Sequence, residues 1–221
     1  HNNLGYTLLN DLEEYARGIQ HIETALRLSP QDPSILCNYS AVLLHRGQPD
    51  EALKLCDKLL ASHPDLHEAR LNRALAALKL GRFAEAWPDY EARKYAQGNY
   101  IPRDFGLPEW SGQPLAGKSI LVYAEQGLGD QIMFASCLPD LLQRARHCHI
   151  ECAPKLETLF RRSFPTATVH ASGRTSLEPG LVAGRGAIDY QVAIGSLPLH
   201  FRTDLSHFPH HAGYFQADPQ R

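Results

Sequence analysis

Apolar residues recur at helical spacing over the first 95 residues, in paired blocks divided by short glycine-containing turns. One pair covers residues 35–46 and 50–62, and the next covers 66–80 and 83–95. Because residues three and four apart share one face of a helix, this pattern predicts amphipathic helices that pack as hairpins.

The helical half repeats with a period of 34 residues. That spacing recurs in three residue pairs: Pro30 and Pro64, Gly47 and Gly81, Ala52 and Ala86. The first unit fits with one extra residue in its turn, near residues 10–14. Residues 1–95 therefore resemble three tetratricopeptide repeats, in which stacking of helix pairs buries the apolar faces. We assign residues 1–97 to this repeat domain.

One polar position is the same in each repeat. Asn3, Asn38 and Asn72 follow one another at spacings of 35 and 34 residues. An amide carries both a donor and an acceptor, so a column of amides could pair with an extended peptide backbone. This resembles the asparagine ladder of the O-linked N-acetylglucosamine transferases and implies a peptide-binding groove for a protein partner. The alternative is that asparagine is simply tolerated on a polar concave face and helps to hold neighbouring helices.

The pattern changes after residue 118. Short apolar, β-rich runs occupy residues 119–124, 147–153, 167–171 and 188–192. Helical patterns separate the first three of these runs, at 130–145 and 155–163. Strands that alternate with helices predict a parallel sheet with crossovers, and ligands of such sheets bind beyond the carboxyl ends of the strands. The predicted fold class is a helical repeat solenoid followed by a Rossmann-like parallel α/β half-domain at 119–221.

Residues 98–118 connect the two halves and are rich in glycine and proline, which excludes a continuous helix. Apolar side chains within this segment predict that it is ordered. We expect it to pack across the end of the solenoid, with Trp110 as its anchor.

The loop after the first predicted strand reads Glu125-Gln126-Gly127-Leu128-Gly129-Asp130. It lacks the third glycine of the dinucleotide fingerprint and the Gly-Lys-Ser/Thr of a Walker loop. A dehydrogenase or methyltransferase is therefore the least favoured class. Together with Pro139 on the next helix, the loop resembles the N-terminal domain of the family 9 glycosyltransferases, the heptosyltransferase relatives. Matching segments also lie around Trp110 in the connector and at residues 213–219.

That resemblance implies the first half of a GT-B fold, which receives the acceptor, a glycan or a protein. The nucleotide-sugar donor is expected to bind a second half that this chain lacks, so no cofactor is expected here and the chain alone is expected to be inactive. By the same resemblance, Asp130 is the base that removes the acceptor proton. The resemblance also implies an inverting transfer.

The glycines Gly127 and Gly129 would permit unusual backbone angles and close approach of a ligand. Glu125 is a second candidate base or an acceptor ligand, and Gln126 could add a neutral contact. The alternative for Asp130 is a structural one, in which it serves as the N-cap of the helix. If Asp130 has only that structural role, the alternative function is a non-catalytic protein–protein interaction module. The repeats would then bind a partner, and the α/β half would be a degenerate platform without activity.

Composition and charge narrow the possible partners and cellular locations. The formal charge is −2 and no basic stripe is present, so a nucleic-acid partner is not expected. No apolar run approaches the roughly 20 residues of a membrane span. The five cysteines are odd in number and form no CxxC pair, which favours buried thiols in a cytoplasmic, reducing setting. Alternation along the strand at 147–153 places His147 and His149 opposite Cys148 and Cys152, so no metal site is expected there.

Overall fold

The computed structural model describes residues 1–9, 14–96, 103, 105–172, 188–210 and 213–219. The chain divides into two compact units, His1–Gln97 and Gly98–Arg221. Each unit has its own core and is described by itself.

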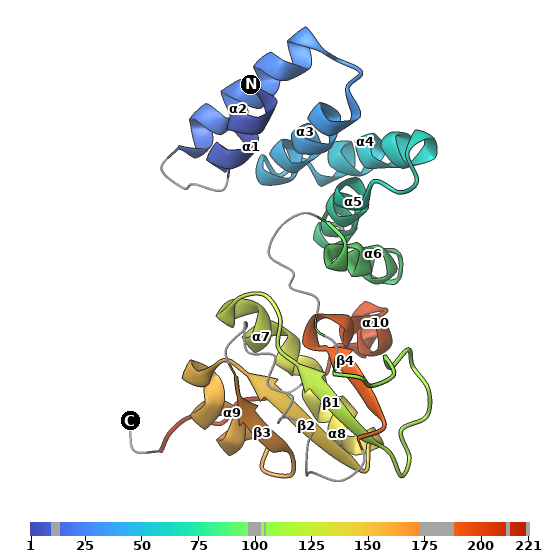
Figure 1. Ribbon diagram of the computed structural model, residues 1–221, viewed down its shortest axis with the longest axis vertical. Helices are drawn as coiled ribbons and strands as arrows, with labels where there is room; N and C mark the ends of the chain where they lie inside the picture. Colours follow the sequence, from blue (N-terminus) through green and yellow to red (C-terminus); the bar gives the residue numbers. More distant parts are fainter. Residues whose placement is uncertain (10–13, 97–102, 104, 173–187, 211–212, 220–221) are drawn as a thin grey trace. The chain divides into compact units, whose positions relative to one another are not determined.

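The first unit is built of helices that pack in antiparallel pairs (Figure 1). Its elements in order are α1 (Asn2–Leu9), α2 (Tyr15–Leu28), α3 (Pro33–His45), α4 (Pro49–Ser62), α5 (His67–Lys79), α6 (Phe83–Tyr90) and the short 3₁₀ helix η1 (Glu91–Lys94). The predicted helical repeat region is confirmed. The extra residue expected in the first turn falls largely on residues 10–13, which lie outside the described residues.

Turn and packing residues account for this arrangement. Gly47 and Gly81 adopt φ of 71° and 73°, which lets the chain reverse between the helices of each pair at little steric cost. Ala52 and Ala86 are fully buried, because their small side chains lie where neighbouring helices approach closely. Asp32 caps α3, and its Oδ1 accepts hydrogen bonds from the backbone N–H groups of the first turn.

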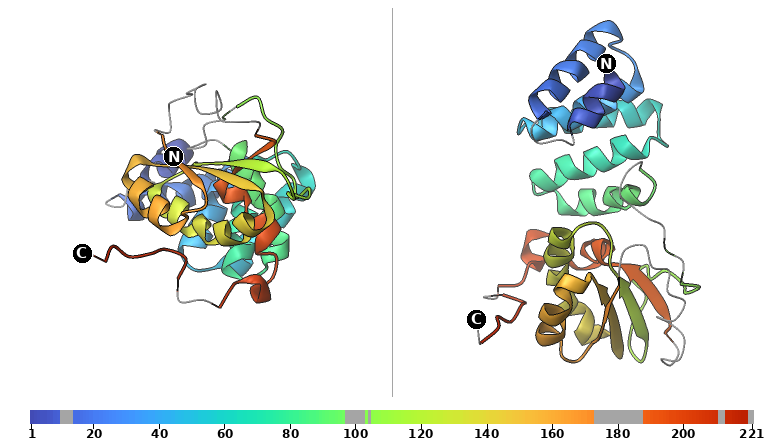
Figure 2. Two further views of the ribbon diagram at one scale, coloured as in Figure 1. Left: turned by 90° about the horizontal axis from the view of Figure 1, so that it is seen from below. Right: turned by 60° about the vertical axis from the view of Figure 1, so that its left-hand side comes forward.

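The second unit contains one parallel sheet in the order β3-β2-β1-β4. Its strands are β1 (Ser119–Tyr123), β2 (His147–Cys152), β3 (Thr168–Ala171) and β4 (Tyr190–Ala193). The helices are α7 (Leu128–Phe134), η2 (Ala135–Cys137), α8 (Leu138–Arg144), η3 (Pro154–Leu156), α9 (Glu157–Ser163), η5 (Ile194–Ser196), α10 (Pro198–Phe201) and η6 (Leu205–His207). Helices α8 and α9 lie along one face of the sheet (Figure 2). The predicted α/β fold class is confirmed.

Two local predictions for this unit need correction. The helix expected at 130–145 is two helices, because residues 135–137 tighten into the 3₁₀ helix η2 and Pro139 then lies in the first turn of α8. Proline has no N–H and is best placed in a first turn, so the chain begins a new helix there.

Trp110 was expected to anchor the connector on the solenoid, and this was wrong. Its backbone N–H donates to the carbonyl of Gln191 at 2.8 Å, and its ring lies 4.4 Å from the ring of His200. The connector thus pairs with the open edge of β4, which supplies unpaired backbone groups, and Trp110 is buried in the second unit.

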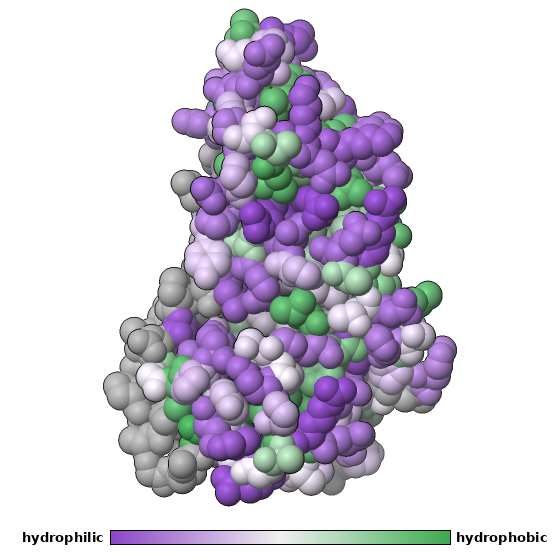
Figure 3. Space-filling view, turned by 90° about the vertical axis from the view of Figure 1, so that its right-hand side faces the viewer, coloured by the Kyte–Doolittle hydropathy of each residue, from purple (hydrophilic) through white to green (hydrophobic). Residues whose placement is uncertain are grey.

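On the face of the molecule shown in Figure 3, apolar residues are scattered among polar ones and form no continuous band. Within the described residues, no helix combines the length and the apolar character that a membrane span requires.

Candidate functional site

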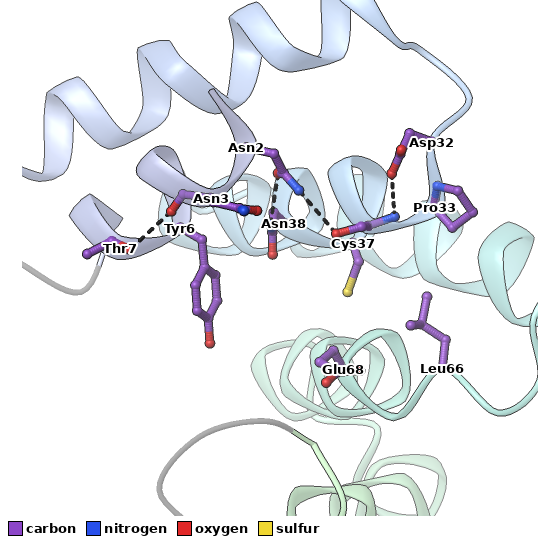
Figure 4. Close-up of a pocket in the computed structure, with 11 residues that line it drawn as sticks. Asn2, Asn3, Tyr6, Thr7, Asp32, Pro33, Cys37, Asn38, Leu66 and Glu68 are labelled. Carbon is purple, nitrogen blue, oxygen red and sulfur yellow. Dashed lines mark hydrogen bonds between the residues drawn. The ribbon is translucent and has the colours of Figure 1, made fainter.

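A groove of about 670 Å³ opens between the first helices of successive pairs, α1, α3 and α5. Its walls are formed by Asn2, Asn3, Tyr6, Thr7, Asp32, Pro33, Ser34, Cys37, Asn38, Leu66 and Glu68. Figure 4 shows Tyr6 projecting from α1 toward the side on which α5 carries Glu68. Tyr6 keeps 46% of its surface exposed.

The asparagines at the equivalent position of the three repeats have different surroundings in the structure. Asn3 is exposed on the wall, whereas Asn38 is half-buried and donates from Nδ2 to Oδ1 of Asn2 at 2.9 Å. Asn2 in turn donates to the hydroxyl of Ser34 at 3.1 Å. This chain of bonds joins α1 to α3 and fixes the floor of the groove (Figure 4).

Asn72 is not among the residues that form the groove wall. Its Nδ2 donates to the carbonyl of Cys37 at 3.1 Å and to the hydroxyl of Ser40 at 2.9 Å. Both bonds join α5 to α3, so they set the spacing of the helices on which the groove depends.

Sequence reasoning named the asparagines but missed most of the groove wall. The signal was helical spacing: Thr7 lies four residues after Asn3, and Ser34 and Glu68 lie four residues before Asn38 and Asn72. Residues four apart share a helix face, so a search outward from each asparagine would have found these side chains. Asn2 was missed because it is adjacent to Asn3 in the sequence and therefore does not share its helix face.

The second candidate site is the loop after β1. Gly127 is the N-cap of α7, with φ −88° and ψ 179°, and Asp130 is the third residue of that helix. Oδ2 of Asp130 accepts a hydrogen bond from the backbone N–H of Gly127 at 2.9 Å. The structural alternative placed Asp130 at the N-cap of this helix, and that position belongs to Gly127 instead. Asp130 nevertheless accepts a hydrogen bond from a backbone N–H group at this end of the helix.

The unusual backbone angle in this loop belongs to Gln126, with φ of 57°, and not to either glycine. Gly127 is extended and Gly129 lies within the helix, so neither glycine uses the unusual angles that it permits. A Cβ added at Gly129 would meet nothing within 4 Å, so the space above this residue is open. Asp130 is half-buried beside it.

Glu125 lies inside the unit. It is 6% exposed, and its Oε1 accepts a hydrogen bond from the backbone N–H of Gly195 at 2.9 Å. This bond ties the carboxyl end of β1 to the first residues after β4. The carboxylate of Glu125 thus holds the loop from inside the unit, and Asp130 is the more exposed of the two acidic side chains.

Among the described residues no group of three metal-binding side chains comes together. The rings of His147 and His149 lie 4.8 Å apart on one face of β2. The side chains of Cys148 and Cys152 are buried, and all five cysteines are free thiols. Burial raises the pKa of Cys148 to about 12, so this thiol is neutral at physiological pH.

Comparison with known proteins supports the repeats. Residues 9–78 match the tetratricopeptide repeat family. "Protein FlbA" of Caulobacter vibrioides is 32% identical over 234 residues, which cover 100% of this chain but 39% of that protein. The chain thus spans well under half the length of this relative, and the similarity includes both units.

Two further relatives match about a third of the chain. "Hsp70-Hsp90 organizing protein 2" of Arabidopsis thaliana is 32% identical over 83 residues, covering 36% of this chain and 14% of that protein. "Peroxisomal targeting signal receptor" of Kluyveromyces lactis is 31% identical over 80 residues, covering 36% and 14%. The chain contains tetratricopeptide repeats, and such repeats support a role in protein interaction.

Proposed function

We propose that the helical unit recruits a protein partner by binding an extended segment of it in the groove between α1, α3 and α5. The observation that carries this proposal is the groove itself, about 670 Å³ in volume and lined by side chains from three successive repeats. The match to tetratricopeptide repeats over residues 9–78 supports it.

The lining suits a peptide main chain. Asn3 is exposed on the wall and carries both a donor and an acceptor, and the exposed ring of Tyr6 offers an apolar face with a polar tip. Asn38 is held in place by its bond to Asn2, so it loses little conformational freedom on binding. Leu66 supplies apolar contact at the α5 end.

The proposal can be tested without knowing the partner. Decapeptides are selected from a random display library against the full chain, and their affinity is then measured for two variants. Thr7→Trp fills the groove from an exposed position on α1, and Lys54→Trp places the same ring on an exposed position of α4, outside the groove. We expect selected peptides to lose binding to the Thr7 variant alone. Equal binding to both variants would refute the groove as the recruiting site.

A second function is proposed for the α/β unit: the acceptor half of a sugar transferase, with Asp130 as the base. It is favoured by the position of Asp130, half-buried beside open space in the loop at the carboxyl end of β1, where ligands of parallel sheets bind. Gly127 donates to one carboxylate oxygen, which holds the side chain in one orientation. In this arrangement the repeats would bring the acceptor, or the protein that carries it, to the enzyme.

The transferase proposal is tested in the protein as its natural gene encodes it, by following release of nucleotide from nucleotide-sugars. Asp130→Asn keeps an acceptor for the N–H of Gly127 but cannot take a proton, so transfer should fall by roughly 10²- to 10⁴-fold. Asp204→Asn alters an exposed carboxylate at the start of η6 and should leave the rate unchanged. Full activity of the Asp130 variant would remove Asp130 from the mechanism.

The five free, buried thiols fit a proposed location in the reducing cytoplasm.

A further inference from the structure

Several polar atoms that line the groove can accept a hydrogen bond from a guest. Asn38 lines the groove and uses its Nδ2 to bond Asn2, so its side-chain oxygen can still accept from a guest. The hydroxyl of Thr7 donates to the carbonyl of Asn3 at 3.0 Å, so only its lone pairs remain for a guest. These acceptors match a guest that brings donors.

Charge points the same way. Asp32 and Glu68 line the groove, and none of its described lining residues is Lys, Arg or His. Oδ1 of Asp32 accepts from the N–H groups of Ser34 and Ile35 at 2.9 and 3.1 Å, which leaves Oδ2 for another donor. The two carboxylates come from successive repeats, at the start of α3 and of α5.

Both carboxylates lie at helix N-termini, where they also stabilise the helices, so the opposing charge has to be counted. Each helix N-terminus carries about +0.5 elementary charge, which sums to about +1 for α3 and α5. The two carboxylates together carry more charge than these two partial charges. The helix dipoles therefore reduce the negative potential without cancelling it.

From these observations we infer that the groove selects a positively charged, extended segment that presents Lys or Arg side chains. The inference rests on the proposed recruiting function and names the chemistry of its partner. Cationic side chains bring only donors, which match the carboxylates and the amide oxygen of Asn38, whereas an acidic segment would meet like charge and unmatched acceptors.

The experiment uses the full chain and three labelled decapeptides with glycine at alternate positions and Lys, Gln or Glu between them. Binding is followed by fluorescence anisotropy at low and at physiological salt. We expect the Lys peptide to bind at least tenfold more tightly than the Glu peptide at low salt. The difference should shrink as salt screens the groove charges.

Two isosteric variants assign the effect to the groove. Asp32→Asn keeps a good N-cap residue and Glu68→Gln keeps the side-chain shape, so both should fold. Each should weaken the Lys peptide about two- to fivefold, the range of an exposed ion pair. Asp50→Asn and Glu51→Gln, exposed in the first turn of α4 and outside the groove, are matched controls that should change nothing.

Three results would overturn the inference. They are tighter binding of the Glu peptide, equal binding of the Lys and Gln peptides, and failure of the Lys peptide to bind at all. None of these results tests the recruiting function itself. That function is tested by whether library-selected peptides lose binding to the Thr7→Trp variant. The two failures are therefore distinguishable.

Discussion

The ion pair between Arg103 and Glu151 joins the connector to the centre of the sheet, and its removal tests the fold of the α/β unit. Nη1 of Arg103 donates to both carboxylate oxygens, at 2.6 Å to Oε1 and 2.5 Å to Oε2. The side chains are 5% and 0% exposed. The carboxylate also accepts from the backbone N–H of Ala124 at 3.1 Å, at the end of β1. The pair thus fixes the connector against two strands.

We predict that Arg103→Met lowers the free energy of unfolding of this unit by about 3–5 kcal/mol, because it leaves a buried carboxylate without its counter-ion. Methionine preserves the apolar contact of the arginine stem. Since whole domains are stable by about 5–15 kcal/mol, the loss should be obvious in a denaturation curve. The double variant Arg103→Met/Glu151→Leu should recover most of the stability, because no unpaired charge remains.

The assay is urea unfolding followed by the fluorescence of Trp110, in a Trp87→Phe background so that one indole reports the α/β unit. Arg161→Met is the matched control: Arg161 pairs with Glu157 at 2.7 Å, but these side chains are 56% and 36% exposed. That loss should stay within about 1 kcal/mol. An Arg103→Met variant no less stable than the Arg161→Met control would refute the description of the pair as buried.

Three further predictions concern packing, pH and thiols. Gly18→Ala should lower the free energy of unfolding of the helical unit by about 1–2 kcal/mol, which thermal unfolding can measure. The added Cβ would lie 2.8 Å from the backbone nitrogen of Leu9, and this overpacking exceeds the gain in helix propensity. Bonds from the Ser119 N–H and from Lys118 hold the pKa of the Asp189 carboxyl below its ordinary value. Its contribution to stability is therefore present above about pH 4 and lost as pH falls through its folded pKa. Asp189→Asn should be less stable than the parent at pH 7, and the difference should shrink as pH falls below 4. The buried cysteines should resist alkylation at pH 8 until the chain unfolds, which mass spectrometry can follow; rapid labelling of the native chain would contradict their burial.

Elements with a strong local pattern could be predicted from the sequence. The helices of the repeats follow from apolar periodicity and from recurring glycine and proline, and the strands follow from short β-rich runs. Boundaries agreed to within a few residues, as with the predicted block 50–62 and α4 at Pro49–Ser62. These features depend on residues close together in the chain, so their signal is present locally.

Features that depend on distant residues could not be predicted in this way. Trp110 pairs with Gln191, 81 residues later in the numbering, and nothing near the tryptophan indicates which edge of which unit it meets. Arg103 and Glu151 are 48 residues apart. The left-handed angle at Gln126 was missed because residues other than glycine adopt it only when the surrounding fold holds them there.

The candidate sites lie between these cases. The asparagine positions followed from the repeat, and they led to the groove. Which amide bonds which depends on the register between helices: Asn2, not Asn3, meets Asn38, while Asn72 lies in the interface of α3 and α5. For the loop after β1, the sequence singled out Asp130 as a candidate base but not its bond to Gly127.

The recruiting groove is tested most directly by side-chain amide NMR of the full chain during titration with a library-selected decapeptide. The account predicts that the amide resonances of Asn3 and Asn38 shift in a saturable manner and that Thr7→Trp abolishes the shifts. Shifts confined to amides away from α1, α3 and α5, with Asn3 and Asn38 unmoved at saturation, would contradict it.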